Sequence, residues 1–93
     1  MQVLVMSVRL YAPWVQSLKQ KRMEVKSLTA RMRHRFNVSV CEVGEQDVHK
    51  TIVLAVAAVC GDTQQADSIA EHIISYITAN SEAEITEIER ELF

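Results

Sequence analysis

The sequence has 93 residues, of which 48% are hydrophobic and 24% are charged, and its formal net charge is −2. This length allows one domain with one core, so we interpret residues 1–93 as a single unit, and the composition excludes intrinsic disorder. The near-neutral total hides an uneven distribution, because residues 17–35 hold seven of the ten Lys and Arg residues beside a single acid, Glu24. That segment carries +6 and the remaining residues carry −8.

The two cysteines, Cys41 and Cys60, both lie inside apolar runs, which favours two buried thiols over a disulfide bond. The longest apolar run, Ile52 to Cys60, is much shorter than a membrane-spanning segment, and no basic leader precedes the first apolar run. We therefore expect a cytoplasmic protein with reduced cysteines and no membrane association.

Residues 2–10 are predicted to form a central strand, because they are nearly all apolar, include three β-branched valines and show no helical spacing. The even positions form the more consistently apolar face and are expected to contact the helices. They are Leu4, Met6, Val8 and Leu10. Pro13, the only proline of the chain, then ends the strand pattern.

A basic helix is predicted to begin at Leu18, with the hydroxyl of Ser17 as its N-cap. At 100° per residue, one arc of this helix is apolar and forms the core contact. It holds Leu18, Val25, Leu28, Met32 and Phe36. Four bases share the flank beside that arc: Lys19, Arg22, Lys26 and Arg33. Lys21 instead projects toward the apolar arc, which indicates either a lysine packed by its stem or a site residue.

The middle of the chain is predicted to contain two strands joined by a turn. Residues 37–43 alternate with period two, residues 44–47 are turn-like, and residues 50–60 are apolar on both alternating faces. The last of these segments is typical of a central strand.

The last third of the chain predicts a second helix and an acidic edge strand. Asp62 or Thr63 can cap a helix that ends near residues 80–81, and its apolar positions follow an i, i+3, i+4 pattern. That pattern comprises Ala66, Ile69, Ala70, Ile73, Ile74 and Ile77. Residues 83–92 alternate apolar and acidic side chains, and charges at a sheet edge discourage aggregation.

The element order is βαββαβ, which predicts an α+β, ferredoxin-like domain with a four-stranded antiparallel sheet and two helices on one face. The first and third strands should be central because they are the most apolar. The opposite sheet face would then expose many small apolar side chains, so we expect a homodimer through it. The residues concerned are Val3, Val5, Val53, Ala55, Ala57 and Val59.

No residue set in the sequence indicates a catalytic, metal or cofactor site. His34, His49 and His72 are dispersed and stand at no metal-ligand interval, and with only two glycines there is no phosphate-binding glycine motif. A cysteine nucleophile needs an exposed electropositive setting, which the sequence allows for Cys60 at the end of an apolar strand and disfavours for Cys41. A non-catalytic protein without cofactors is the expectation, and an enzyme that uses residues 46–47 with His49 is the weakest hypothesis.

The basic flank of the first helix is the candidate site, because an anionic partner would relieve the mutual repulsion of its charges. RNA is the anion that we consider first, and the predicted nucleic-acid-binding residues are Lys19, Lys21, Arg22, Lys26 and Arg33. An equally weighted interpretation is that these bases form a solvated surface and only balance the negative charge of the other residues. The sheet lacks the aromatic pair with which RRM domains stack bases, which disfavours that mode of RNA recognition.

The run SLKQKR at residues 17–22, joined to RFNVSVCEV at residues 35–43, resembles the YlxP-like family of bacterial proteins of unknown function. The dipeptide QD at residues 46–47 and the helix start at Asp62 extend this resemblance over essentially the whole chain. The resemblance implies the ferredoxin-like fold. Because members are often encoded beside transcription-elongation, translation-initiation and ribosome-maturation factors, it also implies ribosomal RNA or a ribosome-associated protein as partner. Cys41 departs from the small residue that members often carry.

Two function classes follow from these observations. The first is a small non-catalytic accessory protein that binds ribosomal RNA through the basic helix. The second is an ACT-like small-ligand-sensing or protein-interaction dimer, which would use the strand-to-helix loops at residues 12–16 and 61–63.

Overall fold

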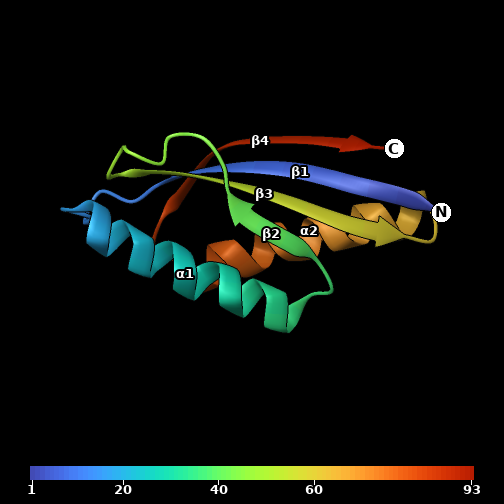
Figure 1. Cartoon of the computed structure of the whole chain (residues 1–93). Helices are drawn as coiled ribbons and strands as arrows, with labels where there is room; N and C mark the ends of the chain where they lie inside the picture. Colours follow the sequence, from blue (N-terminus) through green and yellow to red (C-terminus); the bar gives the residue numbers. More distant parts are fainter.

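The computed structural model describes all residues from Met1 to Phe93. The elements follow the predicted order, as Figure 1 shows. They are β1 (Gln2–Tyr11), α1 (Leu18–Arg35), β2 (Ser39–Glu42), β3 (Thr51–Cys60), α2 (Thr63–Asn80) and β4 (Glu84–Leu92). Neither helix combines the length and the apolar character that crossing a lipid bilayer requires.

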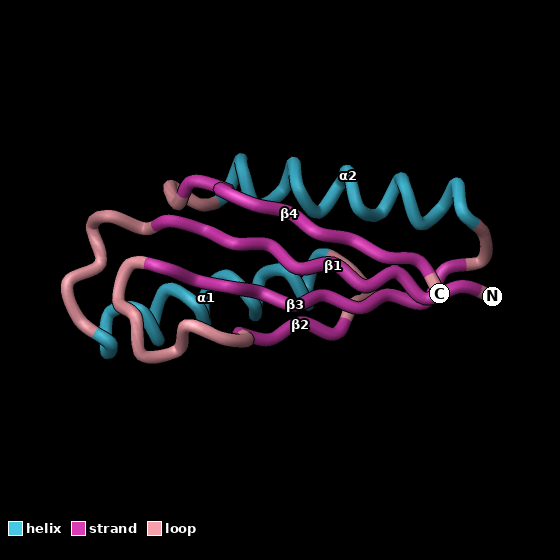
Figure 2. Tube along the Cα trace, turned by 90° about the horizontal axis from the view of Figure 1, so that it is seen from above, coloured by secondary structure: helices cyan, strands magenta, loops and turns pink.

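The four strands form one antiparallel sheet in the order β2-β3-β1-β4, and both helices cover the same face (Figures 1 and 2). The ferredoxin-like fold is therefore confirmed, with β1 and β3 in the centre. Their register pairs Gln2 with Cys60 and Tyr11 with Thr51. The loop after β1 thus lies at one end of the sheet and the loop after β3 at the other end.

The core lies between the sheet and the helices and is built from the side chains that the alternation predicted. Leu4, Met6, Val8 and Leu10 of β1 are all buried. Both predicted N-caps are confirmed, since the backbone N–H of Gln20 donates to Ser17 Oγ at 3.1 Å and that of Gln65 donates to Asp62 Oδ1 at 2.8 Å. These caps satisfy N–H groups that the first helical turn leaves free.

The strand predicted over residues 37–43 is shorter in the structure, where β2 covers only Ser39–Glu42. A left-handed turn follows it, with φ of 61° at Gly44 and 49° at Glu45, and this turn directs the chain away from the sheet. Residues 43–50 consequently form a loop beside α1, which we call the β2–β3 loop.

The prediction of two buried thiols is correct for Cys60 and wrong for Cys41. Cys41 pairs with Ala55 across β2 and β3 and points to the open face of the sheet, where no helix covers it. Its apolar neighbours in the sequence suggested burial, but β2 lies at the sheet edge and only alternate residues reach the core.

Candidate functional site

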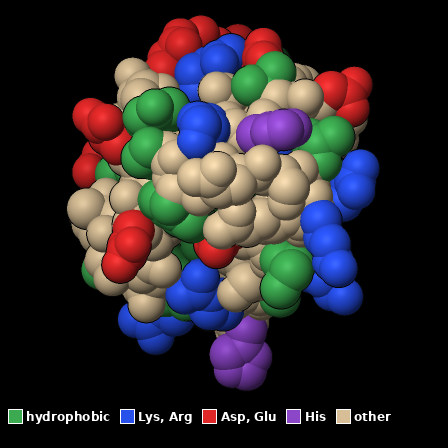
Figure 3. All heavy atoms as spheres, turned by 90° about the vertical axis from the view of Figure 1, so that its left-hand side faces the viewer, with side chains coloured by type: hydrophobic (Ala, Val, Ile, Leu, Met, Phe, Trp, Pro, Cys, Tyr) green, Lys and Arg blue, Asp and Glu red, His purple; other side chains and the backbone are tan.

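Six bases of α1 are exposed in the fold, and four of them form a row along one side of the helix, which we call the basic row. The basic row consists of Lys19, Arg22, Lys26 and Arg33. At 1.5 Å per residue it extends for about 21 Å along the helix axis. Figure 3 shows Lys and Arg side chains gathered on the lower and right-hand sides of the molecule, whereas Asp and Glu lie mainly above and to the left.

The first three side chains of the basic row are free of protein partners. All ion pairs within 4.0 Å involve other residues, and no hydrogen bond of the structure uses the side chains of Lys19, Arg22 or Lys26. Arg33 is engaged once, because its Nη2 donates to the backbone oxygen of Val40 at 3.1 Å. The row therefore presents at least three positive charges that no carboxylate of the chain neutralises.

Lys21 requires a correction, because the structure places it inside the protein. Only 1% of its surface is exposed, and Nζ donates to the backbone oxygens of Glu45 at 2.6 Å and Val48 at 2.8 Å. The same Nζ lies 2.8 Å from Glu42 Oε2 in an ion pair whose angle falls outside hydrogen-bond geometry. Of the two interpretations of Lys21, a packed lysine or a site residue, the first is therefore correct. A side chain that is buried in this way cannot contact a partner at the surface.

A second lysine holds the neighbouring loop, and sequence reasoning did not single it out. Nζ of Lys50 donates to the backbone oxygens of Pro13 and Val15, the latter at 3.0 Å. Lys21 therefore attaches the β2–β3 loop to α1, and Lys50 attaches the β1–α1 loop to the start of β3. The position of Lys50 directly before an apolar strand was the only hint in the sequence that this lysine is structural. Its carbonyl partners could not be predicted, because they lie 35 and 37 positions away in the chain.

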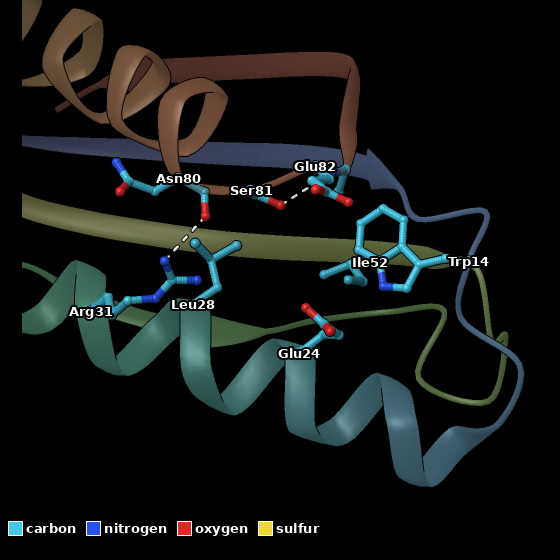
Figure 4. A pocket seen from close by; sticks show the side chains of 9 residues that line it. Trp14, Glu24, Leu28, Arg31, Ile52, Asn80, Ser81 and Glu82 are labelled. Carbon is cyan, nitrogen blue, oxygen red and sulfur yellow. Dashed lines mark hydrogen bonds between the residues drawn. The ribbon is translucent and has the colours of Figure 1, made fainter.

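A cavity of about 210 Å³ lies between α1 and the C-terminal end of α2 (Figure 4). We call it the interhelical cavity. Its lining residues come from the β1–α1 loop, α1, β3, the last residue of α2 and the α2–β4 connection. They are Trp14, Glu24, Leu28, Arg31, Ile52, Asn80, Ser81, Glu82 and Ala83. Glu24, the only acid of the basic helix, was the feature of the sequence that could have indicated this site.

The histidines of the other hypotheses lie at the surface. His34, His49 and His72 are exposed, as are residues 46 and 47, and no three His, Cys, Asp or Glu side chains lie close enough to share a metal ion. The loops at residues 12–16 and 61–63 lie at opposite ends of the sheet (Figure 2). An ACT-like site that uses both loops would therefore need two subunits.

The comparisons with known proteins agree with the resemblance noted in the sequence. The model of the family described as "Protein of unknown function (DUF503)" matches residues 3–90. The chain is 32% identical over 77 residues to "Uncharacterized protein YlxP" of Bacillus subtilis (strain 168), covering 83% of this chain and 84% of that protein. Among solved structures, "De novo designed protein Foldit4" aligns over 100% of this chain and 97% of its own, with 13% identity and a TM-score of 0.49. The match over residues 3–90 and the similarity to YlxP show that this chain belongs to the DUF503 family.

Proposed function

We propose that this protein is a small non-catalytic accessory protein that binds RNA, with ribosomal RNA as the expected target, through the basic row of α1. The observation that carries the proposal is the exposure of Lys19, Arg22 and Lys26 without any carboxylate within 4.0 Å. Each lysine or arginine that meets a phosphate releases condensed counterions, which favours binding at low salt.

The spacing of the charges adds to this argument. Arg22 and Lys26 stand four positions apart on the helix, so their side chains are neighbours that repel each other. Lys19 is three positions before Arg22 and adds to the same potential. A phosphate chain along the row would replace this repulsion with attraction.

The acids that lie beside α1 are paired with other bases, because Glu42 contacts Lys21 and Glu45 contacts Arg9, and neither forms an ion pair with the basic row. β4 carries most of the glutamates of the second half, and it forms the sheet edge opposite to β2. Contacts of α1 are made to the β2 side, where Arg33 reaches Val40. The basic row is therefore not balanced by contact within one chain.

A salt-dependent binding measurement tests the proposal. Fluorescence anisotropy with a ribosomal RNA fragment should give an affinity that falls by about 50-fold between 50 and 200 mM salt for four phosphate contacts to single-stranded RNA. Arg22→Glu should weaken binding at 100 mM salt by at least about fivefold and should lower the salt slope by about 0.7.

Arg90→Glu is the matched control, because it makes the same charge change on β4 and disrupts only exposed ion pairs with Asp67 and Glu71. An equal loss of RNA binding in both variants would show that only net charge matters, which would contradict a site on α1. Absence of any salt-dependent binding would rule out the proposal. If the protein instead self-associates in a charge-dependent manner and does not bind RNA, the basic row contacts the acidic β4 of a second copy.

We further propose a homodimer through the open face of the sheet. Val59 and Phe93 are each 69% exposed there, and Val5 lies beside them on β1. Phe93 is held against Val3 by two backbone hydrogen bonds, which joins these apolar side chains into one patch. Sedimentation equilibrium should show a dimer that Val59→Lys dissociates, and a monomer at high concentration would contradict this part of the proposal without affecting RNA binding.

A further inference from the structure

We propose that the interhelical cavity binds a small organic cation, a primary amine with a short apolar chain. This site is separate from the basic row and does not depend on RNA binding. Its volume of about 210 Å³ is many times the space that a single water molecule needs, which leaves room for a short-chain amine.

The floor of the cavity is apolar and accounts for the chain of the ligand. Leu28, Ile52 and Ala83 line it and are all buried, at 4%, 3% and 8% exposure. Trp14 is only half-buried and borders the opening, where Figure 4 places its ring opposite Leu28. Such a surface favours hydrocarbon over water, and an indole face also attracts a cation.

Two carboxylates border the cavity without a basic partner. Glu24 is half-buried and, in Figure 4, extends from α1 toward the space between Leu28 and Trp14. Glu82 borders the space from the opposite side. Neither makes an ion pair within 4.0 Å, in a chain where five such contacts occur elsewhere.

The helix itself cannot supply a cation to Glu24. The positions that neighbour it on the helix surface are three and four residues away. They hold Gln20, Lys21, Ser27 and Leu28. Lys21 is the only base among them, and it is buried against Glu42 and the carbonyls of the β2–β3 loop. Glu24 is the only acid of α1, and no base of the helix neutralises its charge at the cavity.

The C-terminal end of α2 adds negative potential at the same place. A helix C-terminus carries about half a negative charge, and the last turn of α2 contains no base. Arg31 of α1 is the only base in the lining, and its guanidinium already donates to the backbone oxygens of Asn80 at 3.1 Å and Ser27 at 3.4 Å. Two carboxylates and a helix end thus outweigh one engaged arginine, so the cavity selects a cation.

Trp14 allows a direct test, because it is the only tryptophan of the chain and lines the cavity. Its fluorescence should change in a saturable manner with n-butylammonium chloride at neutral pH. Sodium butyrate and sodium chloride at the same ionic strength should produce no saturation, and n-butanol should bind more weakly. In a ¹⁵N-correlation NMR titration, the amine should shift residues 24–31 and 80–83.

Glu24→Gln should weaken amine binding by about tenfold, the loss expected when a charge-assisted contact becomes neutral. Glu89→Gln, on the open face of β4, removes the same charge outside the cavity and should bind the amine as the original protein does. Equal binding by both variants, equal effects of butyrate and butylammonium, or the absence of shifts at residues 24–31 and 80–83 would overturn the proposal. Far-ultraviolet circular dichroism of both variants separates these results from misfolding, and RNA binding by Glu24→Gln tests the other site independently.

Discussion

The two helices have the same length, similar caps and the same sheet face, yet they are held to the core in different ways. All four buried residues of α2 are apolar: Ala66, Ala70, Ile73 and Ile77. Of the four in α1, only Leu28 and Met32 are apolar, and the other two are Lys21 and Thr29. α2 is therefore attached by apolar burial, whereas α1 depends in part on an internal ion pair and on hydrogen bonds to a loop.

The two buried polar side chains of α1 are both satisfied inside the protein. The hydroxyl of Thr29 is satisfied within the helix by donating to Val25, and Lys21 is satisfied by groups of β2 and the β2–β3 loop. Lys21 is buried and surrounded by partners, whereas Lys19, the same residue type two positions earlier, is exposed and unpaired. The comparison teaches that the bases of one helix can differ in role, because one of them is part of the core and others remain free at the surface.

The largest effect is expected from Lys21→Met. It leaves the half-buried carboxylate of Glu42 without its cation and removes donors to two loop carbonyls, so the free energy of unfolding should fall by about 3–5 kcal/mol. Urea denaturation measures this change, and adding Glu42→Leu should restore much of it. The exposed Lys19→Met should change stability by less than about 0.5 kcal/mol. Equal effects at positions 19 and 21 would remove the distinction between inner and outer lysines.

Truncation of apolar residues should distinguish the two helices directly. Ile73→Ala in α2 and Leu28→Ala in α1 should each cost about 2–5 kcal/mol as buried large-to-small changes. Ile73 should lie near the upper limit, because Leu28 borders the interhelical cavity and has fewer contacts to lose. Thermal unfolding of both variants checks this order, and a larger loss for Leu28→Ala would contradict it.

The N-caps should contribute similar amounts, because each accepts a hydrogen bond from the backbone N–H three residues further along the chain. Ser17→Ala and Asp62→Ala should each lower the free energy of unfolding by about 1 kcal/mol. Ser75→Ala, at an exposed position within α2, should not destabilise the protein because alanine is the better helix former. A cap effect limited to one helix, measured by urea denaturation, would show that the other is held entirely by tertiary packing.

The smallest expected effect is a gain of stability in Arg22→Glu. This change replaces repulsion between positions 22 and 26 with an attractive Glu-to-Lys pair, which should raise the free energy of unfolding by about 0.5 kcal/mol. The same variant should lose RNA affinity, so stability and binding move in opposite directions. A marked loss of stability would instead show that the basic row is structural.

The elements of this fold could be predicted from local patterns, because burial alternates with period two in strands and recurs every three to four residues in helices. The predicted length of β2 and the burial of Cys41 were wrong for one reason. An apolar run indicates a strand, but the number of its residues that pair and the face that is covered depend on its position in the sheet.

The sequence by itself determined the order of the elements, the caps of both helices, the burial of the even face of β1 and the concentration of positive charge on α1. Only the tertiary structure decided which bases are free, because the groups that occupy Lys21 and Lys50 lie 21 to 37 positions away along the chain. It also decided that Glu24, Trp14 and the end of α2 border one cavity. Local periodicity is set by backbone geometry within a few residues, whereas the partners of a charged side chain are set by the packing of distant elements.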